Sequence, residues 1–158
     1  MENKNLGNDG LVIKKRHLPH WMLKGATYFV TFRVKSDEMD VEEQKFTLEH
    51  IKSGNKKFYL LIAAIVMPDH VHVLFTPDEA PNLTSVMKGM KGSSARKINL
   101  KRNTRGTIWQ DESFDQIVMN QNELDKKIQY MFNNPVKKGL TQDPWNYHGW
   151  YLNTEETF

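Results

Sequence analysis

The segment from Ile65 to Phe75 constrains the fold more than any other part of this 158-residue chain. It is rich in Val, Leu and Phe, which favour β-strands. The Met-Pro-Asp at 67–69 is typical of a turn, so we expect two strands joined by a tight connection. His70 and His72 are two positions apart on the second strand. Because a strand repeats every two residues, both imidazoles are expected on one face of the sheet.

Two neighbouring imidazoles on one rigid face form half of a divalent-metal site. Two ligands do not complete such a site, however, and half-buried histidines with backbone partners would show the same spacing. Residues elsewhere in the chain are needed to distinguish a metal site from a purely structural role.

The composition limits the class of protein. Hydrophobic residues make up 39% and charged residues 26% of the chain, which is the balance of one soluble globular domain. No apolar run approaches the roughly 20 residues that cross a bilayer, and the first residues lack a cationic-then-apolar pattern, so we expect no secretion signal. We therefore expect a cytoplasmic protein with no membrane partner. The absence of cysteine excludes disulfides, cysteine-based zinc sites and a thiol nucleophile.

The hydrophobic pattern predicts strands at 26–34, 58–67 and 70–76, and helices at 37–53, 82–100 and 122–133. Residues 107–118 are read as irregular or as a short strand, and Pro135 is expected to end the last helix. This order favours an α+β fold in which helices cover one face of an antiparallel sheet. We predict a single domain over 1–158, with a tail at 1–16 and a variable segment at 145–158.

Positive charge is concentrated in one part of the chain. The net charge of +3 is too small to indicate a nucleic-acid partner, but residues 88–105 contain seven Lys and Arg and no acidic residue. Such a surface would attract a polyanion, although a solvated basic helix is the alternative interpretation. The candidate DNA-binding residues in this segment are Lys88, Lys91, Arg96, Lys97 and Arg102.

Tyr130 lies off the apolar stripe of its helix, which consists of Leu124, Ile128, Met131 and Phe132. Its neighbours one turn away are Lys126, Lys127, Asn133 and Asn134. Ammonium groups favour a phenolate, which is the nucleophilic form, and they screen a phosphodiester. If this helix faces the histidine strand, Asn134 would complete a three-ligand site for a hard metal ion. A surface tyrosine that covers a neighbouring strand is the alternative.

The two segments together are similar to a known family. Residues 67–72 (Met-Pro-Asp-His-Val-His) and 130–140 (Tyr-Met-Phe-Asn-Asn-Pro-Val-Lys-Lys-Gly-Leu) resemble the motifs of single-tyrosine HUH transposases, and more closely those of REP-associated tyrosine transposases. Further similarity occurs at 17–21, 25–33, 108–110 and 114–115. The chain departs from the family after Pro144-Trp145, where Asn146-Tyr147 replaces a common Ser-Ser pair.

The resemblance implies a ferredoxin-like or RRM-like α+β domain. It also implies that His70 and His72, with Asn134 as the polar third ligand, bind Mg²⁺ or Mn²⁺, and that Tyr130 is the nucleophile. The implied substrate is single-stranded DNA near a hairpin, and the family acts as monomers or homodimers. Lys126 and Lys127 are added to the expected DNA contacts.

Three functions are compatible with these residues. In the first, Tyr130 attacks a DNA phosphodiester, forms a 5′-phosphotyrosine and transfers the strand. In the second, a domesticated relative binds a DNA or RNA hairpin without catalysis. In the third, a metal-dependent hydrolase uses water, so Tyr130 is dispensable. The intact histidines and tyrosine favour the first function.

Overall fold

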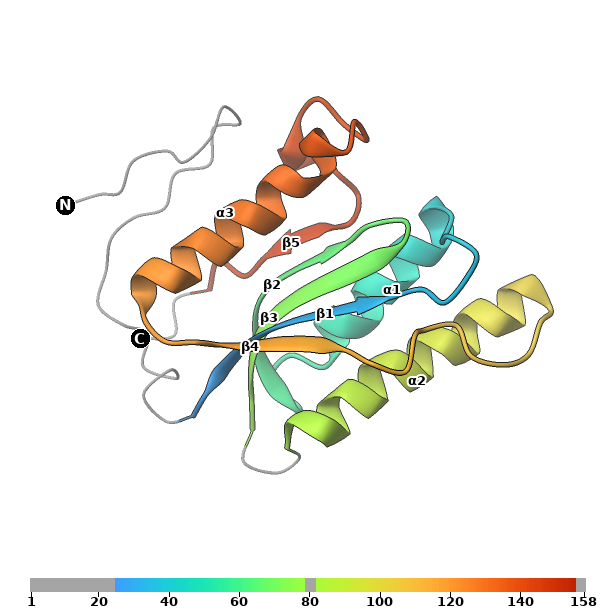
Figure 1. Ribbon diagram of the computed structural model, residues 1–158, viewed down its shortest axis with the longest axis horizontal. Helices are drawn as coiled ribbons and strands as arrows, with labels where there is room; N and C mark the ends of the chain where they lie inside the picture. Colours follow the sequence, from blue (N-terminus) through green and yellow to red (C-terminus); the bar gives the residue numbers. More distant parts are fainter. Residues whose placement is uncertain (1–24, 79–81, 156–158) are drawn as a thin grey trace.

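A computed structural model describes residues 25–78 and 82–155 of the chain (Figure 1). Five strands form one antiparallel sheet in the order β4-β1-β3-β2-β5. The strands are β1 (Thr27–Arg33), β2 (Tyr59–Val66), β3 (His70–Pro77), β4 (Phe114–Val118) and β5 (Trp150–Leu152). The predicted α+β class with an antiparallel sheet is confirmed. The predicted tail at 1–16 and the segment at 17–21 lie outside the described residues.

Helices cover both faces of this sheet. Helices α1 (Val41–Ser53) and α2 (Leu83–Arg102) pack on one face, and α3 (Gln121–Lys137) packs on the other (Figure 1). The expectation that all helices share one face was therefore wrong for α3. The physical reason is that the central strands are apolar on both faces, so each face needs cover. None of the helices in the described ranges is long and apolar enough to cross a membrane.

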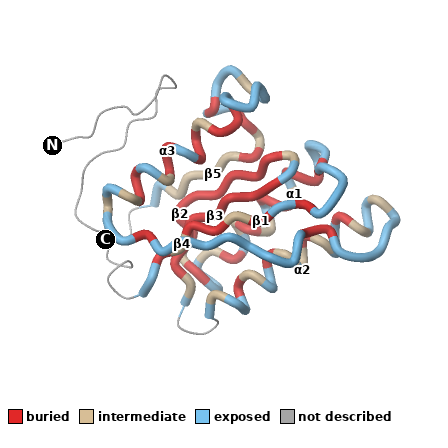
Figure 2. The backbone as a smooth tube through the Cα atoms, in the orientation of Figure 1, coloured by how far each residue is buried: buried red, intermediate tan, exposed pale blue. Residues whose placement is uncertain are grey.

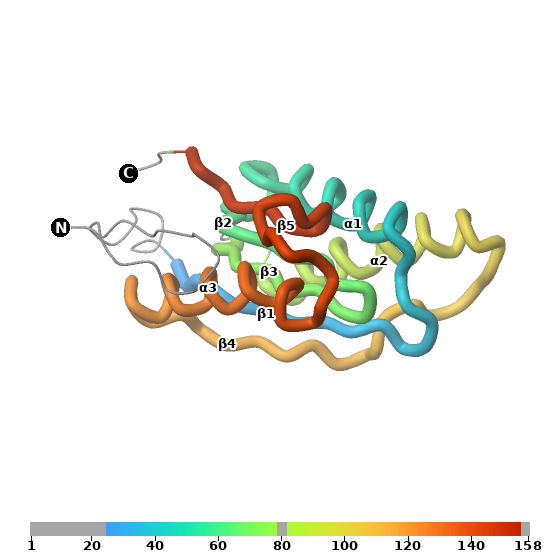
Figure 3. Tube along the Cα trace, turned by 90° about the horizontal axis from the view of Figure 1, so that it is seen from above, coloured from blue at the N-terminus to red at the C-terminus, as the bar shows by residue number. Residues whose placement is uncertain are grey.

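The alternation of side chains along β3 separates two cores. Val71, Val73 and Phe75 belong to the core beneath α1 and α2, whereas Leu74 belongs to the core beneath α3. The even-numbered His70 and His72 consequently point to the α3 face. In Figure 2, β2 and β3 are buried along most of their length and β4 is mostly exposed. Strand β4 forms an edge of the sheet, as Figure 3 also shows.

The helix ends reflect local capping and packing. Helix α1 begins after Asp40, whose carboxylate accepts a hydrogen bond from the backbone N–H of Glu43 in a capping box. Helix α3 continues to Lys137, so the prediction that Pro135 ends it was wrong. A proline inside a helix removes only one backbone donor. Pro135 is buried, and the helical hydrogen bonds resume after it, because Lys138 N–H donates to Asn134 O.

The C-terminal segment, which the sequence left unassigned, crosses back to the sheet. A short 3₁₀ helix, η2 (Pro144–Asn146), leads to β5, which pairs with β2 at the edge opposite β4. Tyr147 fixes this return because its buried hydroxyl contacts Val66 O at 2.9 Å and Gln44 Oε1 at 3.0 Å.

Candidate active site

Each of the two histidines on β3 is held by a hydrogen bond at Nδ1. His70 Nδ1 donates to the carboxylate of Asp69 at 2.6 Å, and His72 Nδ1 shares a hydrogen bond of 2.7 Å with Thr31 Oγ1. Thr31 is the register partner of His72 on β1. The imidazole centroids are 4.7 Å apart. These bonds orient both rings and leave the Nε2 atoms for other partners.

The Nε2 atom of His72 is buried and has no hydrogen-bond partner among the described residues. Burial, with smaller contributions from the neighbouring His70 and Arg33, lowers the pKa of His72 to about 3. Burial lowers the pKa of His70 as well, although Asp69 opposes this shift. Both rings are therefore neutral at pH 7, the form that offers a lone pair to a metal ion. A divalent ion at these rings would satisfy the otherwise unpaired Nε2 atom.

Helix α3 brings Tyr130 beside this pair within the same chain. The ring centroid of Tyr130 lies 5.5 Å from that of His72 and 6.3 Å from that of Phe29. The tyrosine is 50% exposed, so its hydroxyl is not enclosed in the core. The structure thus brings together the two motifs that the sequence could only list separately.

Asn134 is buried on α3, one turn after Tyr130. Met131 of α3 and Leu74 of β3 belong to the same core, so the helix packs on the face of β3 that carries both histidines. No cluster of three His, Cys, Asp or Glu side chains suitable for a metal forms within the described ranges. An amide oxygen such as that of Asn134 is a type of ligand that suits Mg²⁺ or Mn²⁺.

A cavity of about 1120 Å³ opens in front of Tyr130 and His72, bounded by β1, β4 and α3. Arg33, Lys126 and Lys127 line it. Lys127 is also fixed by the sheet, because its ammonium lies 4.7 Å from the centroid of Phe29 and donates to Gln116 Oε1 at 2.6 Å. The acidic Glu112 and Glu123 also line the cavity, so its three cations outnumber its acids by one. Lys126 and Lys127 precede Tyr130 by one helical turn, and cations beside a tyrosine favour binding of a phosphate group.

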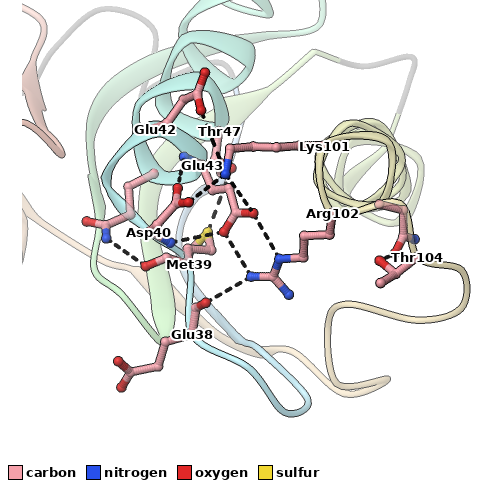
Figure 4. A network of polar contacts seen from close by, with 11 residues as sticks. Glu38, Met39, Asp40, Glu42, Glu43, Thr47, Lys101, Arg102 and Thr104 are labelled. Carbon is pink, nitrogen blue, oxygen red and sulfur yellow. Dashed lines mark hydrogen bonds and ion pairs between the residues drawn. The ribbon is translucent and has the colours of Figure 1, made fainter.

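The other predicted DNA-binding residues lie elsewhere. Lys88, Lys91, Arg96, Lys97 and Arg102 all lie on α2, across the sheet from Tyr130. Arg102 donates to both carboxylate oxygens of the buried Glu43 at 2.9 Å, an ion pair that ties α2 to α1 (Figure 4). Contacts between this segment and DNA stay a prediction, and Arg102 has a structural role independent of them.

Sequence reasoning missed several residues of the site. Asp69 was read only as a turn residue, Thr31 as a strand former, and Arg33 was not singled out. The strand period offered a signal, because Phe29, Thr31 and Arg33 alternate along β1 and must share one face. Which face that is depends on the pairing of Thr31 with His72, and this follows only from the folded register.

Comparison with known proteins shows to which family the residues of this site belong. The sequence model of the family described as "Transposase IS200 like" matches residues 28–134, which is more than half of the chain and includes both histidines, Tyr130 and Asn134. This chain belongs to the IS200-like transposase family. The resemblance expected from the two motifs is confirmed, and membership identifies this IS200-like transposase as a DNA-processing enzyme of the transposition type.

Individual relatives agree with this family assignment. The chain is 24% identical over 123 residues to a REP-associated tyrosine transposase of Escherichia coli (strain K12), covering 75% of this chain and 72% of the relative. A solved structure of a REP-associated tyrosine transposase bound to a REP hairpin superposes with a TM-score of 0.63 at 18% identity. That match covers 87% of this chain and 79% of the solved one. The structural match shows that the IS200-like transposase shares this fold.

Proposed function

We propose that this transposase cleaves and rejoins single-stranded DNA, with Tyr130 as the nucleophile. The observation that carries the proposal is the 5.5 Å separation between the ring centroids of Tyr130 and His72, both of which line one cavity. Tyr130 and His72 line one cavity, and His70 is the neighbour of His72 on β3, so a nucleophile and a proposed metal ligand could reach the same phosphate.

The chemical step is a transesterification. The hydroxyl oxygen of Tyr130 bonds to a DNA phosphorus while the bond from that phosphorus to the 3′ oxygen of the preceding nucleotide breaks. The phenol loses its proton, and the leaving oxygen gains one and becomes a 3′-hydroxyl. The product is a 5′-phosphotyrosine. A 3′-hydroxyl from another DNA end can reverse these steps and release Tyr130, so joining requires no external energy.

His70 and His72, with Asn134, are the residues that would hold a divalent ion, either Mg²⁺ or Mn²⁺. When bound, such an ion supplies electrostatic stabilisation for the charge that develops on the attacked phosphate. Asp69 and Thr31 keep the two imidazoles in the orientation that such a ligand set requires. Arg33, Lys126 and Lys127, which line the same cavity, attract and position the phosphodiester.

We infer that the substrate is single-stranded DNA that carries a hairpin. The relative with the matching fold was solved with a REP hairpin, and the three cations that line the cavity offer contacts to DNA phosphates. The same geometry within one chain is compatible with a monomer or with a homodimer of two independent sites.

A covalent adduct tests the proposal directly. We would mix the protein and Mn²⁺ with an end-labelled single-stranded DNA hairpin and look for label that stays with the protein in SDS. We expect an adduct in the parent chain, none in Tyr130→Phe, and a normal amount in Tyr151→Phe. Tyr151 lies on β5, away from the cavity, and is the matched control.

The competing functions predict different results. Cleavage that persists in Tyr130→Phe would identify a hydrolase that uses water. Hairpin binding without any cleavage, at several Mn²⁺ concentrations, would identify a non-catalytic binder. We also expect His70→Ala to abolish cleavage but to retain most DNA binding, because phosphate contacts dominate affinity.

A further inference from the structure

Phe114 is an exposed aromatic residue beside the proposed site. It begins β4 and is 65% exposed, and it belongs to neither of the two cores. Its register partner on β1 is Thr31, whose partner on β3 is His72. Since directly paired residues project from the same side of a sheet, these three side chains form a row on the α3 face. The row places Phe114 two strand spacings, roughly 10 Å, from His72.

The surroundings of Phe114 favour nucleic acid over a protein core. Phe114 lines the same cavity as Tyr130, together with three cations, Arg33, Lys126 and Lys127, and two acidic residues, Glu112 and Glu123. Arg33 is exposed and makes no ion pair with any residue in the described ranges. An apolar ring next to unpaired cations complements a nucleotide, which joins a flat aromatic base to an anionic phosphate.

The volume of the cavity and the anchoring of the loop before β4 also favour a nucleotide. Its volume of about 1120 Å³ exceeds what one phosphate group fills and is at the upper limit for small-molecule pockets. The loop that leads into β4 is fastened from behind by Lys91, which donates to Gln110 O at 2.8 Å and Ser113 Oγ at 3.2 Å. The aromatic ring is therefore presented on an anchored strand, which lowers the entropic cost of binding.

We propose that Phe114 is a stacking platform for a nucleobase next to the phosphate that Tyr130 attacks. This inference rests on the proposed function, because it places the base relative to the attacked phosphate. Every base has an aromatic face, so the platform tolerates any base at that position. Its contribution is to hold the DNA strand in register with Tyr130.

Binding measurements in a non-cleaving chain test the platform without requiring chemistry. In a Tyr130→Phe background, we would measure the affinity for a fluorescent DNA hairpin with a single-stranded flank, replacing one nucleotide at a time by an abasic site. We expect one abasic position to weaken binding about ten-fold, within the range for base–aromatic stacking. When Phe114→Ala is added, that position should matter less than two-fold, because the ring that contacts the base is gone.

Three further variants separate stacking from other roles. Phe114→Trp should bind like the parent, whereas Phe114→Leu, which keeps apolar area at the strand edge, should behave like Phe114→Ala. Phe58→Ala is the matched control, since Phe58 is a 50% exposed phenylalanine that does not line the cavity. It should leave the abasic profile unchanged.

The outcomes distinguish this inference from the proposed function. An abasic profile unaffected by Phe114→Ala, or full affinity in Phe114→Leu, would overturn the platform while Tyr130-dependent adducts persist. A dimer in sedimentation that Phe114→Ala dissociates would also overturn it, because the ring would then be covered by a second copy. Absence of any adduct in the parent chain would instead overturn the proposed function.

Discussion

Replacing Thr31 by valine tests whether the sheet orients His72 for metal binding. Valine has nearly the shape of threonine but lacks the hydroxyl that shares the 2.7 Å hydrogen bond with His72 Nδ1. His72 is only 3% exposed, so water cannot readily replace the lost partner. The variant therefore leaves a buried ring nitrogen without the bond that fixes the orientation of the imidazole.

The magnitude follows from two effects. Leaving a buried polar group unpaired costs about 1–3 kcal/mol of the free energy of unfolding. Loss of a hydrogen bond that orients a ligand imidazole weakens metal affinity by about 10–100-fold. We expect Thr31→Val to lose about 1–2 kcal/mol in urea denaturation without metal, and at least ten-fold in Mn²⁺ affinity by titration calorimetry.

Thr27→Val is the matched control. Thr27 lies on the same strand and the same face, and its hydroxyl shares a buried hydrogen bond of 2.6 Å with Thr76 Oγ1. It should lose similar stability but retain normal Mn²⁺ affinity, because it does not contact a histidine. Equal Mn²⁺ affinities for Thr31→Val and Thr27→Val would refute the reasoning.

Three other perturbations have defined outcomes. Arg102→Met should lower the free energy of unfolding, measured by urea denaturation, by about 2 kcal/mol at pH 7. Because Arg102 lowers the pKa of Glu43, this loss should become smaller as the pH falls below about 4 and Glu43 is protonated. Without metal, the free energy of unfolding should fall as the pH drops below about 6.5, because the unfolded His72 takes up a proton that the folded one, with a pKa of about 3, does not. The contribution of His72 approaches about 1.4 kcal/mol per pH unit, and His72→Gln should remove that part of the slope. Gly149→Ala should lower the melting temperature by several degrees, because its Cβ would lie 2.2 Å from Val66 O, and an unchanged melting temperature would contradict the close approach.

Much of the architecture was accessible from side-chain periodicity. The run of β-formers and the turn at Pro68-Asp69 predicted two adjacent strands, and the structure places them at Tyr59–Val66 and His70–Pro77. The two-residue period placed both histidines on one face, and the helical period separated Tyr130 from the apolar stripe. Both patterns are local, so they can be recognised without knowledge of the tertiary fold.

Other features depend on contacts between distant segments. Helix α3 packs on the other face of the sheet from α1 and α2 because both faces are apolar and each needs a cover. No single segment of the sequence shows which helix covers which face. Arg102 was predicted to bind DNA because it lies in a basic run, but its partner Glu43 is 59 residues away in the sequence. The row of Phe114, Thr31 and His72 likewise depends on strand register.

The account depends on Tyr130 serving the histidines of its own chain. Mixing His70→Ala protein with Tyr130→Phe protein tests this most directly, because each supplies the part that the other lacks. We predict that the mixture forms no SDS-resistant adduct with labelled DNA over a range of concentrations. Restoration of the adduct in the mixture would show that the tyrosine acts on the site of a second copy, and would contradict the geometry on which the account rests.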